Sequence, residues 1–129
     1  MNKLLPLLLS ALMLTACAPS GGTKPNTYRQ ITADEAAAMM ARETGYIILD
    51  VRRPDEFAAG HIPGAINVAN ETIGTAEIPE LPDKNQLIMV YCRSGRRSKE
   101  AAEKLVKLGY TNIVEFGGIL DWKGDIISE

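Results

Sequence analysis

The sequence contains few residues of the types that usually carry covalent or metal chemistry. Only two of its 129 residues are cysteines, Cys17 and Cys92, and His61 is the only histidine. The formal net charge of −2 is too small to favour nucleic acid or a charged membrane surface as a partner. A chain of this length is expected to form one domain, and we expect a monomer. The two cysteines could form a disulfide with each other. The location of each in the chain therefore decides which of them can react as a free thiol.

The first residues contain no apolar run long enough to cross a membrane. The stretch from Leu4 to Leu14 follows the positive Lys3 and is interrupted by Pro6 and Ser10. It is far shorter than the roughly 20 residues that a helix needs to span a bilayer. These features are typical of a signal peptide, so we exclude residues 1–16 from the fold.

The end of this segment carries a more specific pattern. Leu14-Thr15-Ala16-Cys17 resembles the lipobox of bacterial lipoproteins, in which the cysteine is acylated and becomes the mature N-terminus. The resemblance implies lipidation of Cys17 and a domain held in the periplasm by a membrane anchor, and Ala18 favours the outer membrane. The alternative is an ordinary secretory signal. Lipidated Cys17 would leave Cys92 unpaired in an oxidising compartment.

The next residues separate this segment from the folded domain. Residues 18–27 (APSGGTKPNT) are rich in proline, glycine, serine and threonine, which is typical of a flexible linker. We therefore divide the chain into a signal peptide over residues 1–16, a lipidated N-terminus with its linker over 17–27, and a domain over 28–129.

Strands and helices alternate in the domain. Thr32 and Glu35 predict a capping box at the start of a helix, and short apolar runs predict strands covered on both faces. The strands are expected at 28–31, 46–50, 65–68, 87–91 and 113–116, and the helices from Thr32, over 54–59, over 98–108 and around Trp122. This alternation predicts an α/β fold with a parallel sheet, which binds ligands at the carboxyl ends of its strands.

The segment that follows the strand 87–91 carries the chemistry. It reads Cys92-Arg93-Ser94-Gly95-Arg96-Arg97-Ser98 and leads into the most amphipathic helix. Loop N–H groups, the positive end of the helix and three arginines all favour a thiolate. A cysteine in such surroundings has a pKa of roughly 3.5–7.5. Gly95 supplies backbone freedom, and Ser98 is the expected N-cap.

A thiolate in an anion cradle could attack either phosphorus or a sulfane sulfur. The phosphatase signature places an arginine six residues after the cysteine, but here that residue is Ser98 and Arg97 comes one position too early. The loop from Cys92 to Arg97 has six residues, and a smaller cradle suits one sulfur atom better than a phosphoryl group. Tyr91 also replaces the usual phosphatase histidine. The spacing therefore favours sulfur chemistry over a phosphatase or arsenate reductase.

Four ordered motifs resemble those of single-domain rhodaneses. They are the Cys92–Ser98 loop, Leu49-Asp50-Val51-Arg52, the segment from Glu56 to Asn67, and the segment from Gly117 to Trp122. The resemblance runs from about Gln30 to Gly124. It implies a three-layer α/β/α sandwich around a parallel sheet of about five strands.

The resemblance also implies a reaction. Cys92 would take the outer sulfur of a donor such as thiosulfate and pass it from a persulfide to cyanide or a thiol, without a metal or cofactor. The loop residues Arg93, Ser94, Gly95, Arg96, Arg97 and Ser98 would bind the substrate, with Arg97 as the first choice. A domain that carries persulfide or binds partners without turnover is the alternative.

The remaining polar residues of the motifs are interpreted as structural. Asp50 and Arg52 could act in catalysis, but the structural interpretation is favoured, in which Asp50 at a strand end pairs with a basic residue and braces the loops. Glu56 and Arg53 are similar candidates for bracing. His61 lies among Gly60, Pro63 and Gly64, which favours a fixed turn over a general base. Trp122 is expected to pack on the core.

Overall fold

The computed structural model describes residues 27–129. The signal peptide, the lipidation site Cys17 and most of the linker lie outside these residues, so those predictions stay predictions. Within the described part, no helix is both long and apolar enough to cross a membrane.

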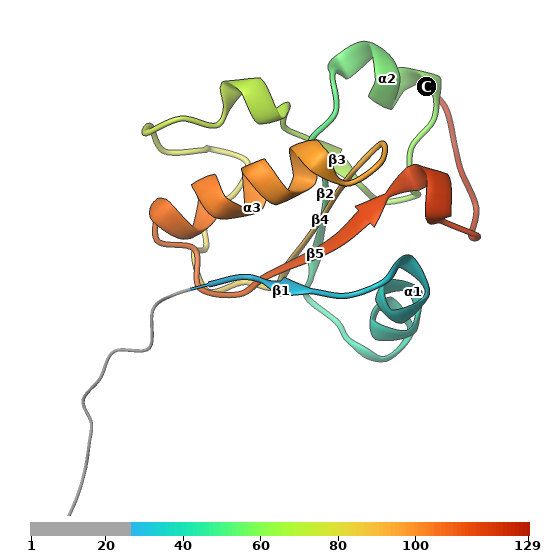
Figure 1. The fold of residues 1–129 in the computed structure, drawn as a ribbon, viewed down its shortest axis with the longest axis horizontal. Helices are drawn as coiled ribbons and strands as arrows, with labels where there is room; N and C mark the ends of the chain where they lie inside the picture. Colours follow the sequence, from blue (N-terminus) through green and yellow to red (C-terminus); the bar gives the residue numbers. More distant parts are fainter. Residues whose placement is uncertain (1–26) are drawn as a thin grey trace, which may run out of the picture.

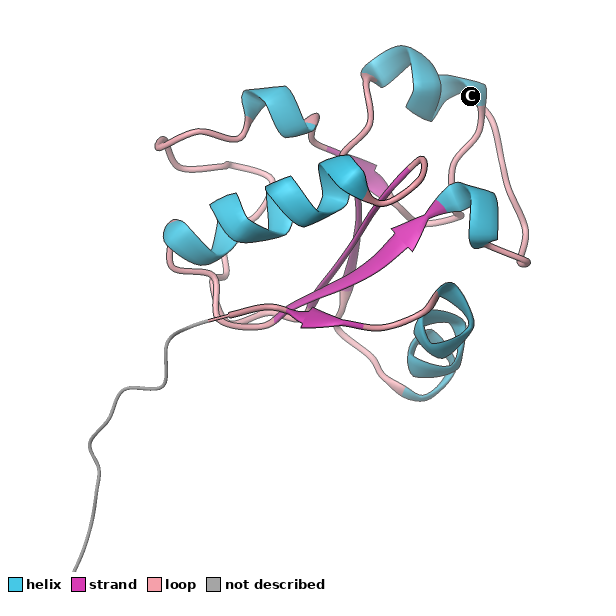
Figure 2. Cartoon of the chain, viewed as in Figure 1, coloured by secondary structure: helices cyan, strands magenta, loops and turns pink. Residues whose placement is uncertain are grey.

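A parallel sheet of five strands forms the centre of the domain (Figures 1 and 2). Its strand order is β1-β5-β4-β2-β3, so β4 and β5 lie inside and β1 and β3 form the edges. The strands are β1 (Arg29–Gln30), β2 (Ile47–Asp50), β3 (Ile66–Asn67), β4 (Ile88–Cys92) and β5 (Ile113–Gly118). Because all pairs are parallel, the carboxyl ends of the strands meet at one edge.

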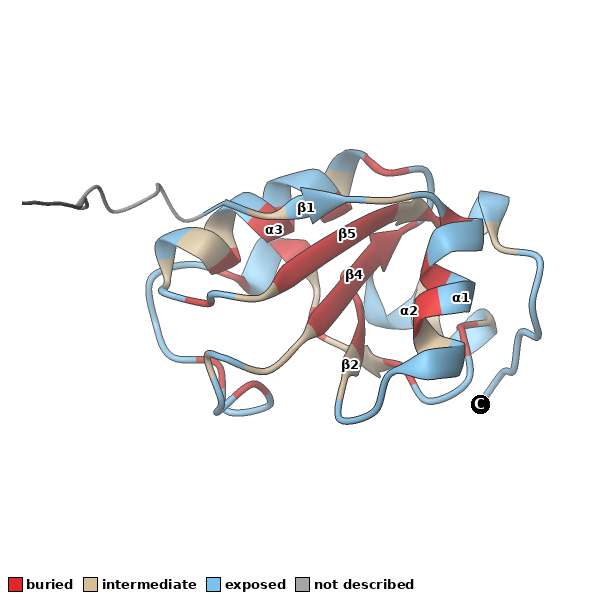
Figure 3. Cartoon of the chain, turned by 90° about the horizontal axis from the view of Figure 1, so that it is seen from below, coloured by how far each residue is buried: buried red, intermediate tan, exposed pale blue. Residues whose placement is uncertain are grey.

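Helices cover both faces of the sheet. The helices are α1 (Ala33–Arg42), α2 (Pro54–Ala59) and α3 (Arg96–Lys107), with 3₁₀ turns η1 (Asn70–Thr72) and η2 (Ile119–Asp121). Along β4, alternate side chains pack on opposite sides: Val90 and Cys92 join the core that contains α3, while Met89 and Tyr91 join the core that contains α1. The strand is buried throughout (Figure 3). The expected three-layer α/β/α sandwich is confirmed.

The sequence predicted the N-terminus of α1 correctly and that of α3 incorrectly. The predicted capping box of α1 is present, because the Thr32 hydroxyl accepts from the Glu35 N–H at 3.1 Å and the Glu35 carboxylate accepts from the Thr32 N–H at 2.8 Å. The predicted start of α3 is wrong. The helix begins at Arg96 after Gly95, which adopts φ +116°, and Ser98 lies buried in the first turn instead of capping it.

The end of the domain also differs from the expectation. Gly117 and Gly118 continue β5 instead of following it, because Gly118 pairs with Cys92 across a register shift in β4. The expected terminal helix around Trp122 is a single 3₁₀ turn that ends before that residue. Trp122 is half-buried and packs against Phe116, with ring centroids 6.2 Å apart.

Candidate active site

Cys92 is the last residue of β4, and its sulfur lies beneath the loop that leads into α3. The residue is 1% exposed. The Gly95 N–H donates to Sγ at 3.0 Å, and the Ser98 hydroxyl oxygen lies 3.5 Å from it. The loop therefore folds back over the sulfur, and a backbone amide and a hydroxyl face it from inside the protein.

These contacts change the acidity of the thiol. Burial raises the pKa of Cys92, because it disfavours the charged form. Hydrogen bonding with the Ser98 side chain and with the backbone of Ser98, Gly95 and Ser94 acts in the opposite direction, and the net pKa is lowered. The direction agrees with the prediction from the sequence, although the direct donors are backbone amides.

The three arginines of the loop occupy different positions. Both terminal nitrogens of Arg97 bind the Glu56 carboxylate of α2, at 2.7 and 3.0 Å. This hydrogen bonding raises the pKa of Arg97, and the charge of Cys92 adds to the effect. Arg96 is exposed and pairs with Glu100 at 3.1 Å. Arg93 is exposed as well.

Two of these guanidinium groups are bound to carboxylates and do not contact the sulfur: Glu56 holds Arg97 and Glu100 holds Arg96. The expected substrate-binding role of the three arginines stays a prediction. The charge of Arg97 acts on Cys92 through space, whereas the direct donors are backbone amides of the loop. Among the predicted substrate-binding residues, Gly95 and Ser98 are buried and Arg93, Ser94 and Arg96 are exposed.

Close approach of two backbone segments fixes the loop from the other side. A Cβ atom on Gly118 would overlap the carbonyl group of Arg93 and crowd Ser94. The Leu120 N–H donates to the same Arg93 carbonyl at 3.2 Å. The glycine pair was noted in the sequence only as a motif, and the structure explains Gly118 by this contact between β5 and the Cys92 loop.

The neighbouring strand end, at the end of β2, holds a buried ion pair. Arg52 Nη2 lies 2.7 Å from Asp50 Oδ2, and both side chains are at least nine-tenths buried. The same Nη2 donates to the Gly60 carbonyl at 2.6 Å, and the Asn67 amide donates to the carbonyls of Asp50 and Arg52. Asp50 thus pairs with a basic residue as predicted, and the pair ties together the segments that follow β2.

His61 has a structural environment. It is buried, its Nδ1 lies 2.7 Å from the Phe57 carbonyl oxygen, and its ring stacks on Phe57 with centroids 3.7 Å apart. Its backbone pairs with Ile127 near the C-terminus. These contacts agree with the prediction that His61 fixes a turn.

Sequence reasoning missed Glu115, which lies in β5 and is 2% exposed. Its Oε2 accepts from the Ser98 hydroxyl at 2.5 Å and from the Gly117 N–H at 2.8 Å. One signal was available in the sequence: a single carboxylate interrupts an apolar run, Ile113 to Phe116, that was expected to be buried.

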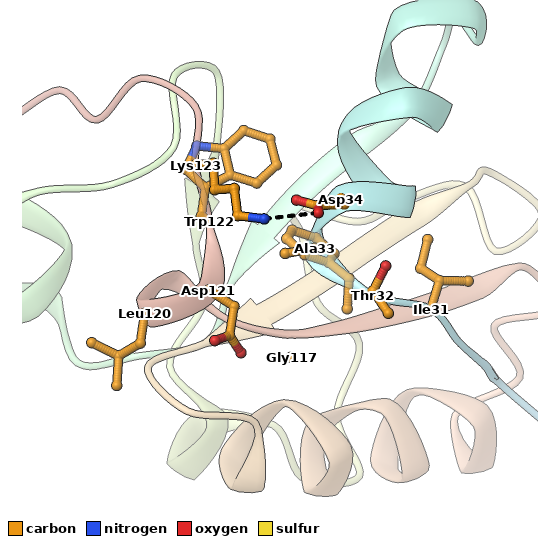
Figure 4. Close-up of a pocket in the computed structure, with 10 residues that line it drawn as sticks. Ile31, Thr32, Ala33, Asp34, Gly117, Leu120, Asp121, Trp122 and Lys123 are labelled. Atoms are coloured by element: carbon orange, nitrogen blue, oxygen red, sulfur yellow. Dashed lines mark hydrogen bonds and ion pairs between the residues drawn. The ribbon is translucent and has the colours of Figure 1, made fainter.

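A cavity of about 480 Å³ lies beside the site, between the start of α1 and η2 (Figure 4). It is lined by Thr32, Asp34, Phe116, Trp122 and Lys123 among others, and Lys123 reaches Asp34 at 3.0 Å. Cys92 and its loop do not line it. Over residues 27–129 there is no cluster of three histidine, cysteine or carboxylate side chains that could hold a metal ion.

A parallel α/β/α sandwich with a thiol cradled at a strand end defines the class of protein. The chain belongs to the rhodanese-like domain family, whose model matches residues 32–125. Two solved structures share this fold. A rhodanese from E. coli determined with anions is 33% identical, with a TM-score of 0.60 over 65% of this chain and 99% of that one. A rhodanese-related protein from Thermoplasma volcanium is 30% identical, with a TM-score of 0.66 over 79% of this chain and all of that one.

The most similar curated proteins include sulfurtransferases. Thiosulfate sulfurtransferase PspE of Escherichia coli is 38% identical over 73 residues, which are 57% of this chain and 70% of that protein. Thiosulfate sulfurtransferase GlpE of Pseudomonas entomophila is 32% identical over 97 residues, 74% of this chain and 85% of that protein. The chain is thus a member of a sulfurtransferase family.

Proposed function

We propose that this protein moves a sulfane sulfur from an anionic donor such as thiosulfate to a thiophilic acceptor such as cyanide or a thiol. The Cys92 thiolate attacks the outer sulfur of the donor. The donor's S–S bond breaks, and its electron pair leaves with sulfite. The product is a Cys92 persulfide with its negative charge on the terminal sulfur. The acceptor then attacks that terminal sulfur, and the thiolate returns.

The observation that carries this proposal is the set of donors around Sγ. The Gly95 N–H lies 3.0 Å from the sulfur, and hydrogen bonds from the loop lower the pKa of Cys92 despite its burial. Fixed amides stabilise a sulfur anion as an oxyanion hole stabilises oxygen, without reorganising during the reaction. A persulfide anion needs this kind of surrounding.

The loop residues divide into two roles under this proposal. Gly95 and Ser98 are buried and contact the reacting sulfur on its protein side, through the Gly95 N–H and the Ser98 hydroxyl oxygen. Arg93 and Arg96 are exposed at the outer side of the loop and supply a positive field that attracts a dianionic donor. Arg97 contributes charge at longer range while it stays bound to Glu56.

The decisive experiment is mass spectrometry of the protein after thiosulfate treatment. We expect a gain of one sulfur atom on Cys92 and formation of thiocyanate when cyanide is added. Cys92→Ala should abolish both, and sulfur transfer that survives in this variant would refute the mechanism. A stable persulfide without thiocyanate would indicate a carrier domain, and hydrolysis of an aryl phosphate without sulfur transfer would indicate a phosphatase.

We also propose that the protein is lipid-anchored through Cys17, with its domain in the periplasm. The support is the Leu14–Cys17 motif, which follows a short apolar segment. Labelled palmitate should be incorporated into the wild-type protein and not into Cys17→Ser. Equal labelling of the two proteins, or no labelling of either, would reduce the segment to an ordinary signal peptide.

A further inference from the structure

Glu115 is a buried carboxylate to which the proposed reaction gives no part. Its neighbours in β5, Val114 and Phe116, are also buried. A buried carboxylate is unfavourable unless hydrogen bonds compensate for lost water, and apolar side chains of similar size are often at least as stable at such positions. Packing alone therefore does not explain a glutamate here.

No cation neutralises this carboxylate directly. Within residues 27–129, no lysine, arginine or histidine nitrogen lies within 4.0 Å of it. On the β1 side, the Gln30 amide lies 3.5 Å from Oε1, and on the β4 side the partner in register is Val90. Burial raises the pKa of Tyr28, and the charges of Glu103 in α3 and of Glu115 add to this effect. Hydrogen bonds from Ser98 and Gly117 are the close polar contacts of Oε2.

Ser98 connects this carboxylate to the nucleophile. Its hydroxyl oxygen lies 2.5 Å from Glu115 Oε2 and 3.5 Å from Cys92 Sγ. The carbonyls of Gly95 and Gly117 are also within reach, at 3.0 and 3.2 Å. A serine hydroxyl has one proton to donate, and the shortest contact is the one to the carboxylate. A separation of about 2.5–2.7 Å is typical of an O–H group bound to an anionic oxygen.

We propose that Glu115 is a positioning residue for Cys92: by accepting the Ser98 proton, the carboxylate withholds that proton from the sulfur. Ser98 then presents a lone pair to Sγ, and the sulfur keeps the loop amides as its donors. The two groups meet at a shared hydroxyl, so the negative charge of Glu115 disfavours ionisation of Cys92.

The effect of this hydrogen bond on reactivity is argued for sulfur transfer, so it rests on the proposed function. The nucleophilicity of a thiolate falls as the pKa of its thiol falls, so the best attacking thiol has a pKa near the ambient pH. The loop amides push the pKa of Cys92 down. A buried carboxylate that holds the Ser98 proton opposes this push and keeps the sulfur reactive.

The test compares Glu115→Gln with the parent chain, both carrying Cys17→Ser so that Cys92 is the only thiol. The Gly117 N–H directs the amide oxygen of glutamine to the position of Oε2, so the shape is kept while the charge is removed. We expect the pKa of Cys92 to fall by about one unit. At a pH below both midpoints the thiolate is then about tenfold more abundant but less nucleophilic, so alkylation by iodoacetamide should be about three- to fourfold faster. An unchanged or raised pKa overturns the proposal.

Glu103→Gln is the matched control. It removes a carboxylate from an exposed position on α3. Solvent screens such a charge, so we expect the alkylation profile of Cys92 to stay unchanged. A shift equal to that of Glu115→Gln would overturn the proposal, because the effect would then come from net charge and not from the shared hydroxyl.

A second measurement does not depend on the folding of Glu115→Gln. The carbon-13 carboxyl resonance of Glu115 in the parent chain should shift over the pH range in which Cys92 ionises. This shift should vanish in Cys92→Ser. A resonance that does not change over this range in the parent chain would contradict the linkage. Neither experiment measures turnover, so an inactive protein with linked titrations refutes only the proposed function, and an active protein without them refutes only this inference.

Discussion

The carboxyl ends of β2 and β4 lie side by side in the sheet, and both lead into a helix, but their charges are arranged in opposite ways. After β2, Asp55 and Glu56 lie in the first turn of α2, where their negative charges interact favourably with the helix dipole and stabilise the helix. After β4, the first turn of α3 contains Arg96 and Arg97 and no acidic residue. The end of β2 is built for stability, whereas the end of β4 keeps positive potential available for an anion.

The buried groups at the ends of β2 and β4 also differ in how their negative charge is stabilised. Asp50 is fully buried and its charge is matched by Arg52. Cys92 is almost as buried, its close donors are backbone amides, and the Ser98 hydroxyl oxygen lies beside it. A fixed ion pair is suited to bracing, while amides can stabilise a charge that moves from one sulfur atom to the next. The Glu56–Arg97 pair joins the two ends.

The largest expected effect is on the brace at β2. Arg52→Ala would leave the buried Asp50 carboxylate without its cation, which costs about 3–5 kcal/mol of the free energy of unfolding. Urea unfolding should show this loss. The control is Arg53→Ala, because Arg53 pairs with Asp55 on the surface, where solvent screening leaves such a pair little effect on stability. Equal losses of unfolding free energy in the two variants would show that the buried Asp50–Arg52 pair is no more important for stability than the surface pair.

The second prediction concerns the end of β4. Gly118 adopts φ −134°, which alanine tolerates, so Gly118→Ala tests only the contact of its Cβ with the Arg93 carbonyl. We expect loss of sulfur transfer and a stability loss of about 1–3 kcal/mol, as for other overpacked sites. Gly74→Ala, which meets no atom within 4 Å, is the control for thiocyanate formation and urea unfolding. Full activity in Gly118→Ala would show that the loop position is not critical.

The third prediction concerns the pair that joins the two ends. Hydrogen bonding to Arg97 lowers the pKa of Glu56 from 4.5 to about 2. Its contribution to stability is therefore present above pH 4.5 and is lost as the pH falls toward 2. Glu56→Gln should be about 1–2 kcal/mol less stable at neutral pH, and the difference should shrink over this acid range. Urea midpoints measured at several pH values check it, and a pH-independent difference would contradict the ion pair.

The smallest effect is expected at Arg96. Its pair with Glu100 is exposed, and its charge lies at the unfavourable end of the helix dipole, so the two contributions offset each other. Arg96→Ala should change the free energy of unfolding by less than about 0.5 kcal/mol. It should nevertheless slow the reaction with thiosulfate at low salt. A stability loss like that of Arg52→Ala would mean that the end of β4 is braced after all.

The sequence predicts the layers and strand positions well, because apolar runs such as Leu87 to Tyr91 and the Thr32–Glu35 box are local signals. It fails where backbone geometry decides. Gly95 turns the chain so early that Ser98 enters the helix and meets Cys92 from inside. The pairing of Arg97 with Glu56 spans 41 positions and cannot be read from spacing. Glu115 resembles a surface residue until β5 is placed inside the sheet.

The parallel direction of the strands has a consequence for orientation. The chain enters the domain through β1, whose amino end lies at the edge of the sheet opposite Cys92 (Figure 1). The residues before Thr27 are therefore attached to the domain on the side opposite Cys92. A domain held from that side presents the Cys92 loop outward, toward molecules in the surrounding solution.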